Sequence, residues 1–167
     1  MAVSNQAGDS EYAFDVAISF QGTDEALAAE ILDLIQDRFR TFIYSKKQDI
    51  LAGRDGEDRF GEVFSNGARV VIVLCRPEWG QTPFTRIEET AVKNRTFNEG
   101  YDFSLFVPTT DPPFVPKWLP KTRLYYNLPR FGVQGLAAVI ERLIEERGGT
   151  PRVESISDRA LMNPLIS

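Results

Sequence analysis

Seven residues near the middle of the chain carry the strongest chemical signal. They run Thr82-Pro83-Phe84-Thr85-Arg86-Ile87-Glu88 and follow an apolar stretch, Val70-Val71-Ile72-Val73-Leu74, that is typical of a buried strand. A threonine followed by proline predicts that a helix begins here. Glu88 would then lie about one turn into that helix, at the carboxyl edge of a parallel sheet, where open α/β sheets bind ligands. Because the chain contains no histidine, we expect this carboxylate to carry any catalysis.

Composition excludes several other functions. The 167 residues, 43% hydrophobic and 26% charged, suit one soluble domain. A net charge of -5, and aromatic residues that do not alternate with basic ones, argue against direct nucleic-acid binding by this domain. The absence of histidine and the single cysteine make a metal site improbable and favour a cytoplasmic protein. No apolar run approaches the roughly 18 residues that a membrane span needs, so we expect no membrane contact.

Strand-like and helix-like segments alternate along the chain. The expected strands cover residues 14–20, 41–45, 68–75, 103–107 and 123–128. Helical spacing is expected at residues 27–38, 60–66, 82–96 and 133–144. This alternation predicts an α/β fold with a five-stranded parallel sheet and helices on both faces. We expect a disordered lead over residues 1–11, one domain over 12–148, and a linker or the start of a further domain over 149–167.

Three motifs resemble the signature boxes of Toll/interleukin-1 receptor (TIR) domains. Phe14-Asp15-Val16-Ala17-Ile18-Ser19-Phe20 resembles the first box, with Ala17 in place of the usual aromatic residue. Phe42-Ile43-Tyr44 and then Leu51-Ala52-Gly53 resemble the second strand and the loop after it. Thr82-x-Phe84-Thr85-x-x-Glu88 resembles the family's Ser-x-Trp-Cys-x-x-Glu pattern. The resemblance spans roughly residues 12–147, with the boxes in the family's order and spacing, and the loop at 50–56 is more similar to bacterial than to animal members.

This resemblance implies a three-layer, flavodoxin-like fold and an activity. Catalytic TIR domains cleave NAD+ between nicotinamide and ribose, so the resemblance implies that NAD+ is a substrate and that no cofactor is needed. The products would be nicotinamide and either ADP-ribose or a cyclic ADP-ribose, and Glu88 aligns with the family's catalytic glutamate. The chemistry needs little else, because nicotinamide leaves without a general acid and one carboxylate can stabilise the resulting oxocarbenium ion.

The resemblance and the predicted topology also suggest which residues contact the substrate. The loop after the first strand meets a helix N-terminus, which suits phosphates or ribose hydroxyls. Phe84 stands where the family usually has a tryptophan. The substrate-binding candidates are Ser19, Phe20, Gln21, Gly22, Thr23, Tyr44, Asp49, Trp79 and Phe84.

Some of these residues also have plain structural interpretations. Thr85-x-x-Glu88 has the spacing of a capping box, so Glu88 could merely close the start of a helix. If Thr82 is the cap, Glu88 lies too far along the helix for that role. The aromatic residues could be core residues, and Glu89 should face solvent.

The resemblance further implies that activity is switched on by self-association, with residues 46–56 packing against a neighbouring copy. It suggests an effector in bacterial antiphage defence that works with a C-terminal sensor domain or a partner protein. The alternative is a TIR scaffold that binds other TIR domains and cleaves nothing. A receiver-type domain fits less well, because Cys75 and Arg76 stand where a receiver needs an aspartate.

Overall fold

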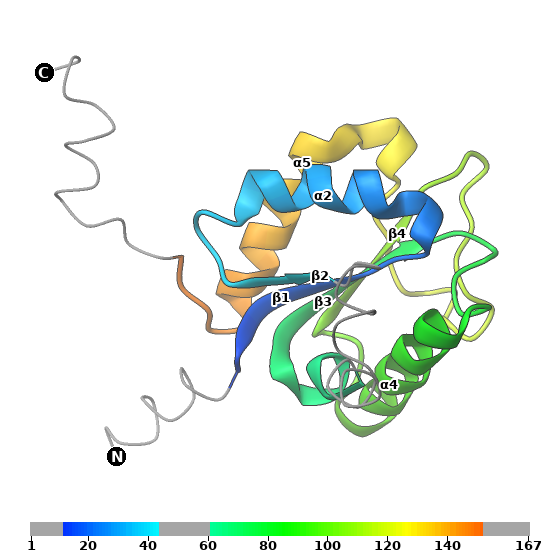
Figure 1. Ribbon diagram of the computed structural model, residues 1–167, viewed down its shortest axis with the longest axis horizontal. Helices are drawn as coiled ribbons and strands as arrows, with labels where there is room; N and C mark the ends of the chain where they lie inside the picture. Colours follow the sequence, from blue (N-terminus) through cyan, green and yellow to red (C-terminus); the bar gives the residue numbers. More distant parts are fainter. Residues whose placement is uncertain (1–11, 44–60, 152–167) are drawn as a thin grey trace, which may run out of the picture.

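The structure, a computed structural model, describes residues 12–43 and 61–151 (Figure 1). Its centre is a four-stranded, all-parallel sheet in the order β2-β1-β3-β4. The strands are β1 (Phe14–Ser19), β2 (Thr41–Ile43), β3 (Ala68–Cys75) and β4 (Ser104–Pro108). The helical elements are η1 (Gly22–Asp24), α2 (Glu25–Ile35), the π-helical η2 (Val63–Gly67), α4 (Pro83–Glu99) and α5 (Leu128–Glu146). The expected lead and nearly all of the expected linker lie outside the described residues.

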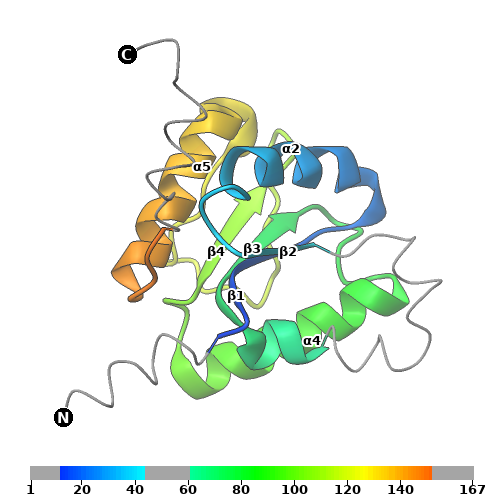
Figure 2. The same cartoon turned by 60° about the vertical axis from the view of Figure 1, so that its left-hand side comes forward.

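Helices cover both faces of the sheet, as the alternating pattern predicted. Figure 2 shows α2 and α5 side by side over one face and α4 across the other. Successive strand residues point to opposite faces, so Val16, Ile18 and Ile72 join the core beneath α2 and α5. Ala17 and Val73 join a second core beneath α4 and η2. The α/β class with a parallel sheet is therefore confirmed.

The prediction of a fifth strand at residues 123–128 is wrong for the described part of the chain. The segment runs beside β4, and Tyr126 N donates a hydrogen bond to Phe106 O at 2.9 Å, but no strand pairing follows. Its Leu124 side chain is 87% exposed and has no core to join. Asn127 then caps α5, which begins at Leu128, earlier than expected, and contains a break at Gly132.

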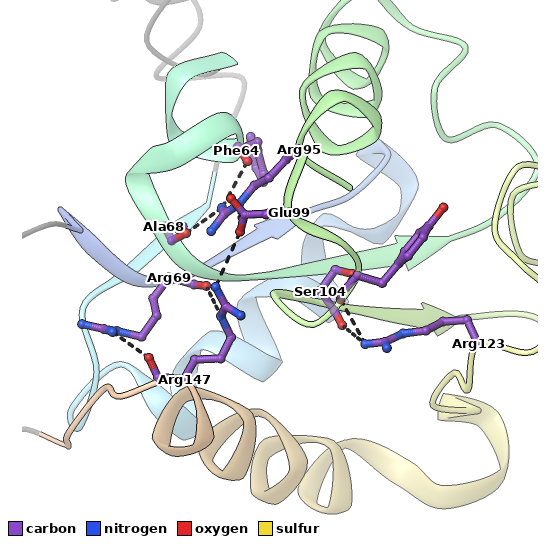
Figure 3. Close-up of polar contacts among 9 residues, drawn as sticks. Phe64, Ala68, Arg69, Arg95, Glu99, Ser104, Arg123 and Arg147 are labelled. Carbon is purple, nitrogen blue, oxygen red and sulfur yellow. Dashed lines mark hydrogen bonds and ion pairs between the residues drawn. The ribbon is translucent and has the colours of Figure 1, made fainter. Parts of the chain in front are cut away.

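Arginines fasten the amino-terminal end of β3 to the ends of α4 and α5 (Figure 3). Arg69 Nη1 donates to Arg147 O at 2.8 Å, and Arg147 Nε donates to Arg69 O at 3.1 Å. Arg95, which is 4% exposed, donates from Nη1 to Ala68 O at 2.7 Å and from Nε to Glu99 Oε1 at 3.0 Å. Most of these bonds join a guanidinium to a backbone carbonyl, so these arginines are structural.

Gly149 fits tightly against this cluster. A Cβ at this position would lie 2.5 Å from Ile144 Cγ2 and 3.0 Å from Arg69 Cδ. Gly149→Ala is therefore expected to lower the free energy of unfolding, measured by urea denaturation, by about 1–3 kcal/mol through overpacking. Gly22→Ala is the matched control, because a Cβ there would meet nothing within 4 Å. Equal losses in the two variants would contradict the tight fit.

Candidate functional site

The start of α4 sets the position of Glu88. Thr82 is the N-cap residue and Pro83 follows it, as the sequence predicted. Thr82 Oγ1 accepts from Thr85 N at 3.3 Å, and Thr85 Oγ1 accepts from Thr82 N at 3.2 Å. These two bonds complete the capping box without Glu88, which lies in the second turn. The capping interpretation of Glu88 is therefore wrong.

Glu88 is instead part of a buried chain of hydrogen bonds at the carboxyl edge of the sheet. Ser19, the last residue of β1, donates from Oγ to Glu88 Oε1 at 2.5 Å. Trp79, in the loop between β3 and α4, donates from Nε1 to Ser19 Oγ at 2.8 Å. The exposed fractions of Ser19, Glu88 and Trp79 are 0%, 3% and 4%. Three segments that are distant in the sequence thus meet at one carboxyl group.

The donor and acceptor roles in these hydrogen bonds follow from the chemistry of the three side chains. An indole N–H can only donate, so the Ser19 oxygen must be the acceptor for Trp79. The hydroxyl proton of Ser19 is then available for Glu88. Trp79 therefore orients Ser19, and Ser19 orients the carboxyl group.

Burial raises the pKa of Glu88 to about 8, and the hydrogen bond from Ser19 opposes that rise. At neutral pH most molecules consequently carry a neutral carboxylic acid at this position. A carboxyl group with a strongly shifted pKa at a ligand-binding edge is a candidate acid, base or electrostatic catalyst.

An ion pair joins two loops at the same edge. Arg76 Nε donates to Asp24 Oδ2 at 2.6 Å, and Arg76 Nη2 donates to Asp24 Oδ1 at 2.6 Å. Asp24 is 4% exposed, so the pair is largely shielded from water. The sequence analysis missed this pair, because 52 residues separate its members and no local motif connects them.

The other predicted site residues are divided between several environments. Phe20 packs in the core beneath α2 and α5, on the sheet face opposite to Ser19 and Glu88. Gln21 caps η1, where its Oε1 accepts from Thr23 N at 2.7 Å. Gly22 and Thr23 are exposed in η1, at the same edge of the sheet as Ser19.

Phe84 and Glu89 lie beside Glu88 on α4. Phe84 is half-buried one helical turn before Glu88. Glu89 is not fully solvated as expected; it is half-buried and accepts from Trp118 Nε1 at 3.0 Å. Tyr44 and Asp49 lie outside the described residues, so their roles stay predictions.

Within residues 12–43 and 61–151, no three His, Cys, Asp or Glu side chains gather closely enough to hold a metal ion. No helix described there is sufficiently long and apolar to cross a membrane.

A cavity of about 730 Å³ lies at the opposite, amino-terminal end of the sheet, where Arg123 and Arg147 share its lining with Asp102 and Glu146. Both arginines donate to backbone carbonyls and also pair with carboxylates among the described residues, Arg123 with Asp102 and Arg147 with Glu99.

No known family model matches the chain, and no curated protein is significantly similar to it. Function has to be argued from the chemistry of the site itself.

The shifted pKa of Glu88 makes stability depend on pH. Between about pH 4.5 and 8 the folded protein holds a proton that the unfolded chain has lost. The free energy of unfolding should therefore fall as pH rises through this window, by up to about 1.4 kcal/mol per pH unit. Glu88→Gln keeps an acceptor for Ser19 but has no carboxyl proton to lose. Its free energy of unfolding, measured by urea denaturation, should therefore lack the part of the pH dependence that Glu88 causes.

Glu30→Gln, which changes an exposed glutamate on α2, is the control and should keep the wild-type slope. If Glu88→Gln and wild type became less stable in parallel between pH 5 and 8, Glu88 would not be the group responsible.

Proposed function

We propose that the chain is a bacterial-type TIR domain, with the three-layer flavodoxin-like fold of that family, that cleaves NAD+ between nicotinamide and ribose. One observation carries this proposal. A single carboxyl group, that of Glu88, is buried at the carboxyl edge of a parallel sheet and oriented there by Ser19 and Trp79. The assignment to this family is proposed from the three TIR-like motifs, and the reaction is proposed from the buried carboxyl group.

In the proposed reaction the bond from ribose C1′ to the nicotinamide nitrogen breaks, and its electron pair neutralises the pyridinium. The ribose is left as an oxocarbenium ion, which ionised Glu88 would stabilise across a short distance. Water then adds at C1′ and loses a proton, which yields ADP-ribose. An adenine nitrogen of the same molecule would yield a cyclic product instead. The positive charge of bound NAD+ favours ionisation of Glu88, because an opposite charge nearby lowers the pKa of a carboxyl group.

The raised pKa suggests how such an enzyme would stay inactive. A neutral, enclosed Glu88 neither stabilises a cation nor meets a ribose. Activation by self-association, with residues 46–56 packing against a neighbouring copy, would open the site and admit NAD+. Gln21, Gly22 and Thr23 would then meet the ribose or phosphates at the start of α2, and Phe84 would stack against the substrate. Tyr44, Asp49 and Phe20 stay candidate contacts of the assembled form.

The biological setting follows from the resemblance alone. We propose a cytoplasmic effector of antiphage defence, in which loss of NAD+ or a nucleotide signal halts infection. A C-terminal sensor domain or a partner protein would trigger the assembly.

One observation favours the alternative, a non-catalytic TIR scaffold. Glu88 is enclosed and hydrogen-bonded within the protein, as a purely structural polar group in a core would be. In that case the carboxyl group would fix the junction of β1 and α4, and the domain would act only by binding other TIR domains.

Release of nicotinamide separates the two functions. Wild type at high concentration in a crowding agent is expected to release nicotinamide from NAD+, and Glu88→Gln to reduce kcat/KM by about 100-fold or more, as loss of a key electrostatic group does. Glu89→Gln should stay close to wild type. Because kcat/KM reports groups of the free enzyme, it should rise with pH through the pKa of Glu88, which is about 8 in the closed form and lower where assembly hydrates the carboxyl group.

The absence of nicotinamide release from wild-type assemblies, with Glu88→Gln indistinguishable from them, would support the scaffold.

A further inference from the structure

The Asp24–Arg76 pair has the features of a strong interaction. Its two bonds, both 2.6 Å, use the planar fork of the guanidinium against both carboxylate oxygens. The side chains are only 5% exposed for Asp24 and 20% exposed for Arg76, so salt and water weaken the pair little. The pair also joins Asp24, in η1 after β1, to Arg76, the first residue after β3.

Backbone hydrogen bonds within the loop restrain residues 76–81. Trp79 N donates to Arg76 O at 3.0 Å, and Gln81 N donates to Glu78 O at 3.0 Å, which makes two successive turns. Gly80 has a φ of 88°, and a Cβ there would lie 2.8 Å from Glu89 Oε1. A rotation of the loop about Arg76 would therefore carry the Trp79 indole with it.

The ion pair and the Trp79 indole hold the loop at two separate points. The loop is held to the β1 side at Asp24 by Arg76 and at Ser19 by Trp79. Ser19 in turn holds Glu88. Breaking the ion pair would leave the loop held by the indole–hydroxyl bond, by a 3.4 Å bond from Arg86 Nη2 to Gln81 O, and by the packing of Trp79 in the core beneath α4 and η2.

We propose that the Asp24–Arg76 ion pair is a latch, which keeps residues 76–81 closed over Ser19 and Glu88 and so regulates access to the glutamate. Its role as a regulator of catalysis rests on the proposed function, whereas its mechanical role does not. Arg76 and Asp24 are positioning residues in this scheme, because they act on Glu88 through Trp79 and Ser19. Opening the latch would let water and substrate reach the carboxyl group.

One other charge contacts the latch weakly: Glu78 Oε1, on a side chain that is 57% exposed, lies 3.9 Å from Arg76 Nη1. The other charged side chains in the first two turns of the helices that begin at this edge are Glu25 and Glu30 on α2 and Arg86 and Glu89 on α4. The raised pKa of Glu88 results from burial, opposed by Ser19, and not from these groups. An open latch should thus act on Glu88 mainly by hydrating it.

The test uses Trp79 as its own reporter. The chain has two tryptophans, so Trp118→Phe leaves Trp79 as the single emitter. In this background Arg76→Gln is expected to shift Trp79 emission to longer wavelength and to raise its acrylamide quenching constant several-fold. The pH titration of Trp79 emission, which senses Glu88 through Ser19, should move from a midpoint near 8 toward lower pH. Glu88→Gln should abolish that titration.

Two further variants distinguish opening of the latch from misfolding and from the loss of any ion pair. Asp24→Asn combined with Arg76→Gln removes both charges, so it leaves no buried unpaired carboxylate and should fold even if Arg76→Gln alone does not. It is expected to show the same open Trp79. Arg38→Gln breaks a more exposed ion pair with Glu141, 2.6 Å long, and should leave Trp79 emission, quenching and titration unchanged.

Unchanged quenching and an unchanged midpoint in the folded double variant would overturn the latch, whatever the enzyme does with NAD+. On the proposed function, the same variant should also release nicotinamide faster than wild type at low protein concentration. If Trp79 opens and no variant or assembly releases nicotinamide, the NAD+ reaction fails while the mechanical latch stands.

Discussion

The cost of burying one carboxyl group organises the carboxyl edge of this sheet. An ionised Glu88 with 3% exposure would lose most of its hydration, so burial holds the proton on it up to about pH 8. The hydroxyl of Ser19 donates to the carboxyl group, and the indole N–H of Trp79 donates in turn to the Ser19 oxygen. The Thr82 cap fixes where α4 begins, and thereby which helical position faces Ser19.

The two ends of the sheet are built differently. At the amino-terminal end, arginines bond mainly to backbone carbonyls and join β3 to the ends of α4 and α5. Such bonds hold the side chain of one element to the main chain of another. At the carboxyl end the contacts are between side chains of different segments, namely Ser19 at the end of β1 with Glu88 on α4, and Asp24 in η1 with Arg76 after β3. A rigid base with side-chain contacts at the ligand-binding edge is an arrangement in which loops can move without disturbing the core.

The sequence predicted those features that depend on local patterns. The apolar run at 68–75 became β3 with the expected bounds, and Thr82-Pro83 began a helix, because strand burial and capping are local effects. The position of Glu88 at the sheet edge followed from these two elements. The strand expected at 123–128 failed, because strand formation depends on pairing with a neighbour, and here β4 offers Tyr126 little more than one backbone bond.

The contacts within the site could not be predicted in the same way. Ser19 was expected to meet a substrate, but in the structure it bonds Glu88, which is 69 residues away. Phe20 was predicted as another substrate contact, and strand alternation places it on the sheet face opposite to Ser19. Which side chains meet across three segments depends on how tightly the loops close, and no spacing within one segment encodes that.

Burial holds Glu88 as a neutral acid in the resting protein. The most direct measurement is the titration of its side-chain carboxyl carbon by ¹³C NMR, with the resonance assigned by its loss in Glu88→Gln. The resting protein should give a midpoint near pH 8, far above the ordinary value of 4.5. A midpoint close to 4.5 would contradict the account, because Glu88 would then be ionised and hydrated at neutral pH.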